Sequence, residues 1–278
     1  MTTATVKKIV IPTNLTNQSL NLIKYGIQIM KGETCQIILL HLIPLPDSIP
    51  ELLMLPREEE RLEKINTSFN KALDRIRKSY AVEISSLEVM HLYGDSSPKI
   101  RNFIDTKGID LVLCPVQAGR NTDDNTLDSF TRIAKDISCP VLYIPDNTPA
   151  QSFRKITYVL DTDDRYTLLL DDLLLNLTAG NDYYITFLVV FKPGTNMEKL
   201  EYVLNKVYLN EKLKQINCSV HLIQENDFTG GVYTFVEEFK ADLLVTGRKK
   251  SMFGNIFSRK RISSDVAKHT RVPFLTIA

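Results

Sequence analysis

The sequence predicts an α/β protein built from two similar halves, each with a parallel β-sheet that helices cover on both faces. Three observations lead to this prediction. Five apolar segments of the first half recur in the same order in the second, segments with helical spacing separate them, and 278 residues exceed the roughly 100 to 200 of one typical domain. The repeat has to be recognised first, because it determines how every later segment is interpreted.

The five recurring segments have the composition of buried strands. They are short and rich in β-branched and aromatic residues, as expected for strands that are buried on both faces of a parallel sheet. The equivalent pairs are 8–14 with 156–163, 36–43 with 183–191, 86–93 with 218–224, 108–114 with 240–246, and 139–144 with 272–277. Each pair is expected to form the same strand of the two halves.

Helices are expected between these strands. The segment 17–30 begins at Asn17, a residue type favoured at helix N-caps, and its apolar residues have three- and four-residue spacing. The other predicted helices are 57–80, 97–106 and 129–137 in the first half, and 164–177, 197–215, 230–239 and 261–269 in the second. Strands that alternate with helices imply βαβ crossovers and therefore parallel sheets. The polar segment 146–154 is the predicted linker, so the domains are 1–147 and 153–278.

Composition excludes several classes of protein. Lys and Arg number 34 against 33 Asp and Glu, and this net charge of +1 creates no field that would hold a polyanion or an anionic membrane. With 44% hydrophobic and 24% charged residues, the chain is neither disordered nor a transmembrane bundle. We therefore expect no membrane partner, and we do not favour nucleic acid as a partner.

The compartment is predicted from the cysteines and the start of the chain. Cys35, Cys114, Cys139 and Cys218 are widely spaced and form no pairing motif, and residues 1–5 lack the pattern of a secretory signal. We expect free thiols in the reducing cytoplasm.

Several motifs together resemble those of a known family. They are the opening segment Lys-Lys-Ile-Val-Ile-Pro-Thr-Asn at 7–14, the histidine near the end of the second strand, the Ile/Ala-Asp-Leu of the fourth strand and the Cys/Val-Pro start of the fifth. The chain resembles the universal stress protein family over residues 7–144 and again over 155–278, and so looks like a tandem member.

The resemblance implies a specific architecture. Each half should be a flavodoxin- or Rossmann-like (HUP-type) doubly wound domain with a five-stranded parallel sheet in the order 3-2-1-4-5. Some family members bind adenine nucleotides such as ATP or AMP, and members dimerise through the fifth strand. Because an edge strand presents unpaired backbone groups, we expect 141–144 to pair antiparallel with 274–277 within one chain.

The nucleotide-binding members carry a G-x2-G-x9-G-(S/T) signature after strand four, whose glycines let backbone N–H groups reach phosphates. In the first half the signature positions are taken by Pro115, Ala118, Asp128 and Ser129. The loop 119–128 carries one arginine against three aspartates, which would repel a triphosphate. Asn14 also replaces the usual aspartate after strand one. We predict that the first half binds no nucleotide.

The second half keeps part of the signature. Gly247 holds the first position, whereas Lys250, Lys260 and Arg261 replace the other glycines and the hydroxyl. The loop 247–261 has six positive charges and no acid, and Asp163 stands where the resemblance places an adenosine-contacting aspartate. Two interpretations stay open: the basic side chains hold phosphates, or the loop is a solvated surface. The candidate cofactor-binding residues are Asp161, Asp163, Gly247, Lys250, Lys260 and Arg261.

Other candidate sites have ordinary structural explanations. Asp161, Asp163 and Asp164 suggest a divalent metal, but capping of the next helix is the favoured reading. His41, His91 and His221 recur at strand ends, and their spacing matches no zinc site, so we interpret them as architectural.

No pattern in the sequence supports a catalytic residue. It contains no P-loop and no G-x-S-x-G elbow. The apolar connection 48–56 and the leucine-rich helix 164–177 are interpreted as core packing, with a partner contact as the alternative.

The sequence therefore leads to two functional hypotheses of different classes. The first is a cytoplasmic, non-catalytic binding or adaptor protein of the stress response, with degenerate nucleotide sites. The second is an ATP- or AMP-responsive switch, or a slow ATPase, that acts through the second half. Weak binding of nucleic acid or of an anionic surface by the basic loop is a third hypothesis. A protein partner and a further homodimer both stay open.

Overall fold

The computed structural model describes the chain in two compact units. Residues up to 115 together with 120–141 form the first unit, and 116–119 together with 142–278 form the second. The described residues are 6–30, 32–43, 45, 48–54, 67–94, 96–116, 137–145, 148–151, 153–160, 182–247 and 271–277. The predicted domain boundaries at 147 and 153 stay a prediction.

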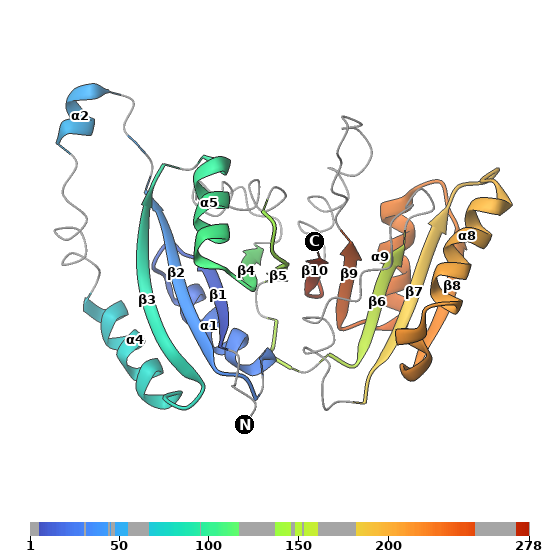
Figure 1. Ribbon diagram of the computed structural model, residues 1–278, viewed down its shortest axis with the longest axis horizontal. Coiled ribbons are helices and arrows are strands. Elements are labelled where there is room, and N and C mark those ends of the chain that lie inside the picture. Colours follow the sequence, from blue (N-terminus) through green and yellow to red (C-terminus); the bar gives the residue numbers. More distant parts are fainter. Residues whose placement is uncertain are drawn as a thin grey trace. The chain divides into compact units, whose positions relative to one another are not determined.

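The first sheet has the strand order β3-β2-β1-β4-β5, which confirms the predicted order 3-2-1-4-5 for this half (Figure 1). Central strands β1 and β4 are almost wholly buried, as expected when helices cover both faces. The β1·β2, β1·β4 and β2·β3 pairs are all parallel. The strand bounds are Lys7–Pro12 for β1, Cys35–Ile43 for β2, Ile84–Tyr93 for β3, Leu111–Val116 for β4 and Val141–Pro145 for β5.

Helices lie on both faces of this sheet, with α5 in front and α1 behind in Figure 1. Helix α1 sits so close to the sheet that a Cβ on Gly26 would come within 2.8 Å of Leu113 Cδ1. The N-cap of α1 is Thr16 rather than the predicted Asn17. The helix bounds are Asn17–Ile29 for α1, Ile49–Leu53 for α2, Thr67–Ser79 for α4 and Ser97–Lys107 for α5.

The second sheet repeats this order. Its strands follow the order β10-β9-β6-β7-β8, and the described pairs are again parallel. The strand bounds are Lys155–Leu160 for β6, Tyr184–Phe191 for β7, Cys218–Gln224 for β8, Leu243–Gly247 for β9 and Phe274–Ile277 for β10. The expected antiparallel pairing of 141–144 with 274–277 stays a prediction.

The predicted helix 197–215 is wrong in its extent. Helix α8 (Met197–Tyr208) is capped at its C-terminal end by Leu209, and a separate 3-10 helix, η1 (Glu211–Gln215), follows. The carbonyl of Asn210 accepts the N–H of Leu213 at 3.0 Å, so this asparagine starts the new turn, a role for which its side chain is well suited. The third helix of this unit is α9 (Phe228–Phe239).

An aspartate immediately before the fourth strand joins that strand to the first strand in each unit. Asp110 Oδ2 accepts the N–H of Lys8 at 2.8 Å, and the N–H of Asp110 donates to the carbonyl of Lys8 at 2.9 Å. Asp242 likewise accepts the N–H groups of Arg154 and Lys155 at 2.9 and 3.0 Å. The recurrent Asp-Leu motif of the sequence is therefore a structural clamp.

The residue two positions before each clamp has a left-handed backbone. Gly108 caps α5 with φ 61°, and Lys240 caps α9 with φ 53°. Glycine adopts this conformation without steric cost, whereas a lysine does not. The two halves thus keep the same turn geometry although only the first has the residue that favours it.

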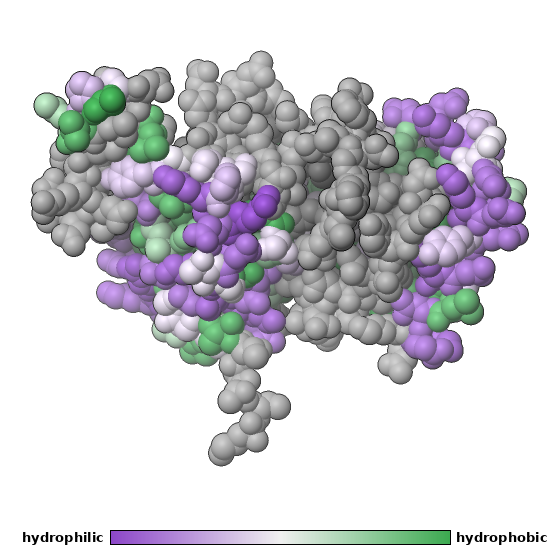
Figure 2. Space-filling model, turned by 45° about the horizontal axis from the view of Figure 1, so that its top comes forward, coloured by the Kyte–Doolittle hydropathy of each residue, from purple (hydrophilic) through white to green (hydrophobic). Residues whose placement is uncertain are grey.

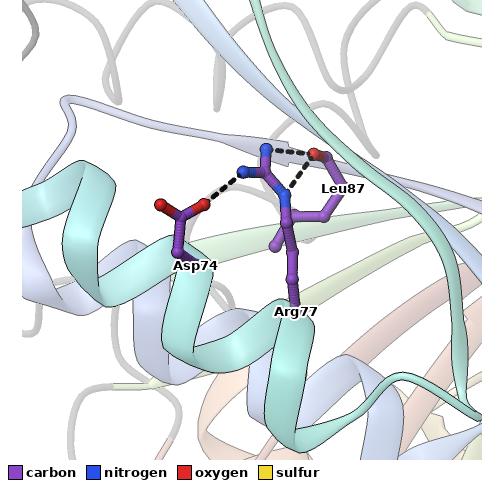
Figure 3. A network of polar contacts seen from close by, with 3 residues as sticks. All are labelled: Asp74, Arg77 and Leu87. Atoms are coloured by element: carbon purple, nitrogen blue, oxygen red, sulfur yellow. Dashed lines mark hydrogen bonds and ion pairs between the residues drawn. The ribbon is translucent and has the colours of Figure 1, made fainter.

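Arg77 ties helix α4 to the outer strand β3 (Figure 3). Its Nε and Nη2 donate to the carbonyl of Leu87 at 3.1 and 2.6 Å, and its Nη1 pairs with Asp74 at 2.8 Å. The guanidinium therefore occupies a backbone acceptor at the edge of the first sheet.

The interpretation of the connection 48–56 as core packing is wrong for its described apolar residues. Ile49, Leu53 and Met54 are 73%, 83% and 84% exposed. Figure 2 shows a patch of hydrophobic surface, in green, over α2. The leucine-rich segment 164–177 lies outside the described residues, so its predicted packing stays a prediction.

Candidate functional site

In doubly wound sheets, ligands bind at the carboxyl ends of the strands where the strand order reverses. In the first unit this point lies between β1 and β4. The polar side chains after β1 form hydrogen bonds within their own turn. Thr13 is fully buried, its Oγ1 accepts the N–H of Leu15 at 2.8 Å, and it lies 2.5 Å from Ser19 Oγ.

The next residues close the same loop. Leu15 has φ 62°, a left-handed conformation that is uncommon for a leucine. Asn14, which replaces the aspartate that the resemblance implies, accepts a hydrogen bond from Thr16 Oγ1 at 2.7 Å through its Oδ1. The turn that would meet an adenosine is therefore held together by its own side chains.

Pro115 takes the first glycine position of the signature and is buried within β4. A proline has no N–H to donate to a phosphate, and its φ is fixed. This position therefore supplies neither of the properties for which a glycine is used there. Ala118, Asp128 and Ser129 lie outside the described residues.

In the second unit, the equivalent strand ends are adjacent. Val159 of β6 pairs with Thr246 of β9, and Gly247 is the last residue of β9. A Cβ on Gly247 would lie 3.5 Å from the hydroxyl of Tyr158, an ordinary contact, so the described packing does not require a glycine here. The other candidates, Asp161, Asp163, Lys250, Lys260 and Arg261, lie outside the described residues, as does Asp164.

The structure brings together two histidines that the sequence treats separately. His41 and His91 are in-register partners on β2 and β3, and their Nδ1 atoms lie 3.0 Å apart. The rings meet edge-on at a centroid distance of 5.2 Å. One imidazole must donate and the other accept, so the pair has opposite tautomers when both are neutral.

A signal for this pair was present in the sequence. Each histidine is the third residue from the end of its strand, and parallel in-register strands place such residues side by side. His221 has different neighbours. Its ring lies 5.3 Å from that of Phe235 and 6.4 Å from that of Phe239, within an aromatic cluster on α9.

A shallow pocket of about 350 Å³ lies at the opposite, amino-terminal edge of the second sheet. Thr148, Lys240, Asp242 and Arg271 are among its lining residues. Burial raises the pKa of Asp242, although the N–H groups of Arg154 and Lys155 counteract this effect. The carboxylate of Asp242 is already hydrogen-bonded to these backbone N–H groups. We therefore interpret the pocket as a structural feature of the clamp and not as a ligand site.

The described part of the chain lacks two other kinds of feature. It holds no group of three or more His, Cys, Asp or Glu side chains that could bind a metal ion. Among its helices, none has both the length and the apolar character needed to span a bilayer.

The family to which the chain belongs agrees with this architecture. The family model described as the universal stress protein family matches residues 5–145. The chain belongs to this family. No curated protein matches the chain.

Solved structures show the same fold over both halves of this universal stress protein. One, a universal stress protein from Archaeoglobus fulgidus DSM 4304, is 16% identical with a TM-score of 0.68, and 97% of this chain and 95% of that chain are covered. A putative universal stress protein from Pseudomonas aeruginosa UCBPP-PA14 is 10% identical with a TM-score of 0.56, and the coverage is 99% and 94%.

The fold also occurs in a protein with a different description. The cytoplasmic domain of a prokaryotic cation chloride cotransporter is 12% identical with a TM-score of 0.51, covering 98% of this chain and 95% of that one. Since one fold hosts different functions, the function of this chain has to be argued from its own residues.

Proposed function

We propose that this universal stress protein is a non-catalytic binding or adaptor protein of the stress response, located in the cytoplasm, whose first half has lost its nucleotide site. The observation that carries this proposal is the closed turn after β1. The side-chain oxygen of Thr13 is hydrogen-bonded to Ser19 Oγ and to the N–H of Leu15. Asn14 Oδ1 is hydrogen-bonded to Thr16 Oγ1. Polar atoms engaged in this way are not available for a ligand without breaking those bonds.

The first half also lacks one backbone donor at a position of the family signature, Pro115. Pro115 removes an N–H donor from the end of β4. Binding at this end would need another source of positive charge, and the sequence of the following loop, 119–128, has a net charge of −2 from one arginine and three aspartates. The stress-response role rests on membership of the family.

A second candidate function is a nucleotide-responsive switch in the second half. Gly247 favours it, because the residue is retained at the end of β9 although the described packing leaves room for a Cβ. In this alternative, ATP or AMP binds through Lys250, Lys260 and Arg261, with Asp161 and Asp163 on the nucleoside side. Side-chain cations then replace the backbone cradle of the family signature.

Isothermal titration of the full chain with ATP and with AMP separates the two candidates. The proposed function predicts no binding in the micromolar range. Micromolar binding that disappears in the Lys250→Ala, Lys260→Ala variant, and persists in the control Lys71→Ala, Lys78→Ala variant of exposed α4 lysines, would replace the proposal by the switch. Binding that survives both variants would show a nucleotide site that does not depend on Lys250 and Lys260, and it would contradict the predicted absence of micromolar binding.

A further inference from the structure

Strand β8 is the outer strand of the second sheet. Its one strand neighbour in the described part of the chain is β7. Ile185 N–H donates to the carbonyl of Asn217, and Glu225 N–H donates to the carbonyl of Phe191, so the odd-numbered residues of β8 turn their backbone groups toward β7. Backbone groups alternate in direction along a strand, and those of Cys218, Val220, Leu222 and Gln224 therefore point away from the sheet.

The surface of β8 is also poorly covered. Every one of its seven residues is at least partly exposed, and Leu222 is 45% exposed. The reason lies in the position of α8, whose buried residues Leu200 and Val203 pack on Val189 of the neighbouring strand β7. Helix α8 thus covers β7, and the apolar side chains of β8 lie at the margin of the core.

The equivalent outer strand of the first unit is protected. The N–H of Gly94 donates to the carbonyl of Ile43 on β2, so the backbone groups of the odd-numbered residues of β3 point away from the sheet. Arg77 binds the outward carbonyl of Leu87 (Figure 3). Lys99 Nζ binds the outward carbonyl of Tyr93 at 3.1 Å. Basic side chains at an edge discourage the addition of another strand.

Strand β8 has no such protection. Its sequence Cys-Ser-Val-His-Leu-Ile-Gln contains no charged residue and no proline. No side chain in the described part of the chain donates to its outward carbonyls. An uncharged edge of this kind is a template for strand addition.

We propose that β8 pairs antiparallel with β8 of a second copy of this chain, about a two-fold axis at His221. This register is the one in which every outward-facing residue finds a partner. Cys218 lies opposite Gln224 of the second copy, and Val220 lies opposite Leu222, so each pair exchanges both N–H···O bonds. The branched side chains of Val220 and Leu222 then meet on the α8 face of the joined sheet.

The charges that flank β8 favour the antiparallel direction. The preceding segment, Glu211–Gln215, has two lysines and one glutamate, whereas Glu225 and Asp227 follow the strand. Antiparallel pairing sets the positive flank of one copy beside the negative flank of the other. Parallel pairing would set like charges together, which opposes association. A second copy is therefore the occupant that fits this edge.

Sedimentation equilibrium of the full chain tests whether β8 forms a dimer contact. The wild-type chain should sediment at twice its mass of 31.7 kDa. Leu222→Lys should abolish the dimer, because it puts a charge in the seam at a site already half exposed. The matched control Leu209→Lys alters a residue that is 74% exposed and lies outside β8, and it should leave the dimer intact. A monomeric wild-type chain, or a folded Leu222→Lys variant that still dimerises, would overturn the proposal.

Oxidative cross-linking tests the register in a Cys218→Ser background. His221→Cys places two cysteines across the axis with Cα atoms about 4.5 Å apart, within disulfide range. Ser219→Cys faces Ile223 of the other copy, and its own counterpart is about 13 Å away, beyond reach. We expect a covalent dimer from the first variant only. No cross-link for His221→Cys, or equal cross-linking of both variants, would overturn the proposed pairing.

Discussion

Replacing Asp110 by alanine tests the clamp that joins β4 to β1. The carboxylate accepts the N–H of Lys8 at 2.8 Å, one residue before β4 begins at Leu111. A hydrogen bond to a charged group contributes about 1.5 to 3 kcal/mol. Because both residues are half-buried and water can reach the freed N–H, we expect the lower end, a loss of about 1.5 kcal/mol in the free energy of unfolding.

Urea denaturation followed by circular dichroism measures this loss. Asp110→Asn keeps one acceptor oxygen and should lose about half as much, since its hydrogen bond is neutral. The control Asp74→Ala removes a carboxylate that is 60% exposed in a surface ion pair, and it should change stability by no more than about 0.5 kcal/mol. The clamp is refuted if Asp110→Ala lowers the free energy of unfolding no more than this control does, or if Asp110→Asn lowers it as much as Asp110→Ala.

Three further predictions concern backbone conformation, thiol chemistry and domain pairing. Lys240→Gly should raise the melting temperature and add roughly 0.5 to 1 kcal/mol of stability, because φ is 53° there; unchanged or lower stability would contradict this. Burial raises the pKa of the Cys35 thiol to about 11, so the native state holds this proton more tightly than the unfolded state and stability falls as pH rises from 9 to 11. Alkylation at pH 8 should therefore modify the partly exposed Cys218 before Cys35. Modification of Cys35 first would contradict the raised pKa of its thiol. Finally, cleavage at a protease site inserted in the linker 146–154 should leave the halves co-eluting if their fifth strands pair; separate elution would disprove that pairing.

The repeated strands could be predicted from the sequence because each is a short, apolar segment between polar turns. The order of the first sheet followed from the family resemblance and is confirmed. The break after α8 was missed because the amphipathic spacing continues through Asn210, so that only the local capping geometry reveals it.

The candidate site was harder to predict, because it depends on register and local hydrogen bonds. The His41–His91 pair requires the alignment of β2 with β3, and the roles of Thr13 and Asn14 depend on which neighbours their oxygens reach. Similarly, the sequence shows that Ile49 and Leu53 are apolar, but it does not show whether the fold covers them. Composition identifies such residues, and tertiary contacts decide what they do.

The central claim is that the nucleotide pocket of the first half has been lost. Native mass spectrometry of the purified full chain, with denaturing analysis of any released small molecule, tests it most directly. We predict a mass that corresponds to protein alone, with no copurified adenine nucleotide. Recovery of two adenylates per chain would show that both halves bind, and it would contradict the closed turn at Thr13 and Asn14 as the basis of the proposed function.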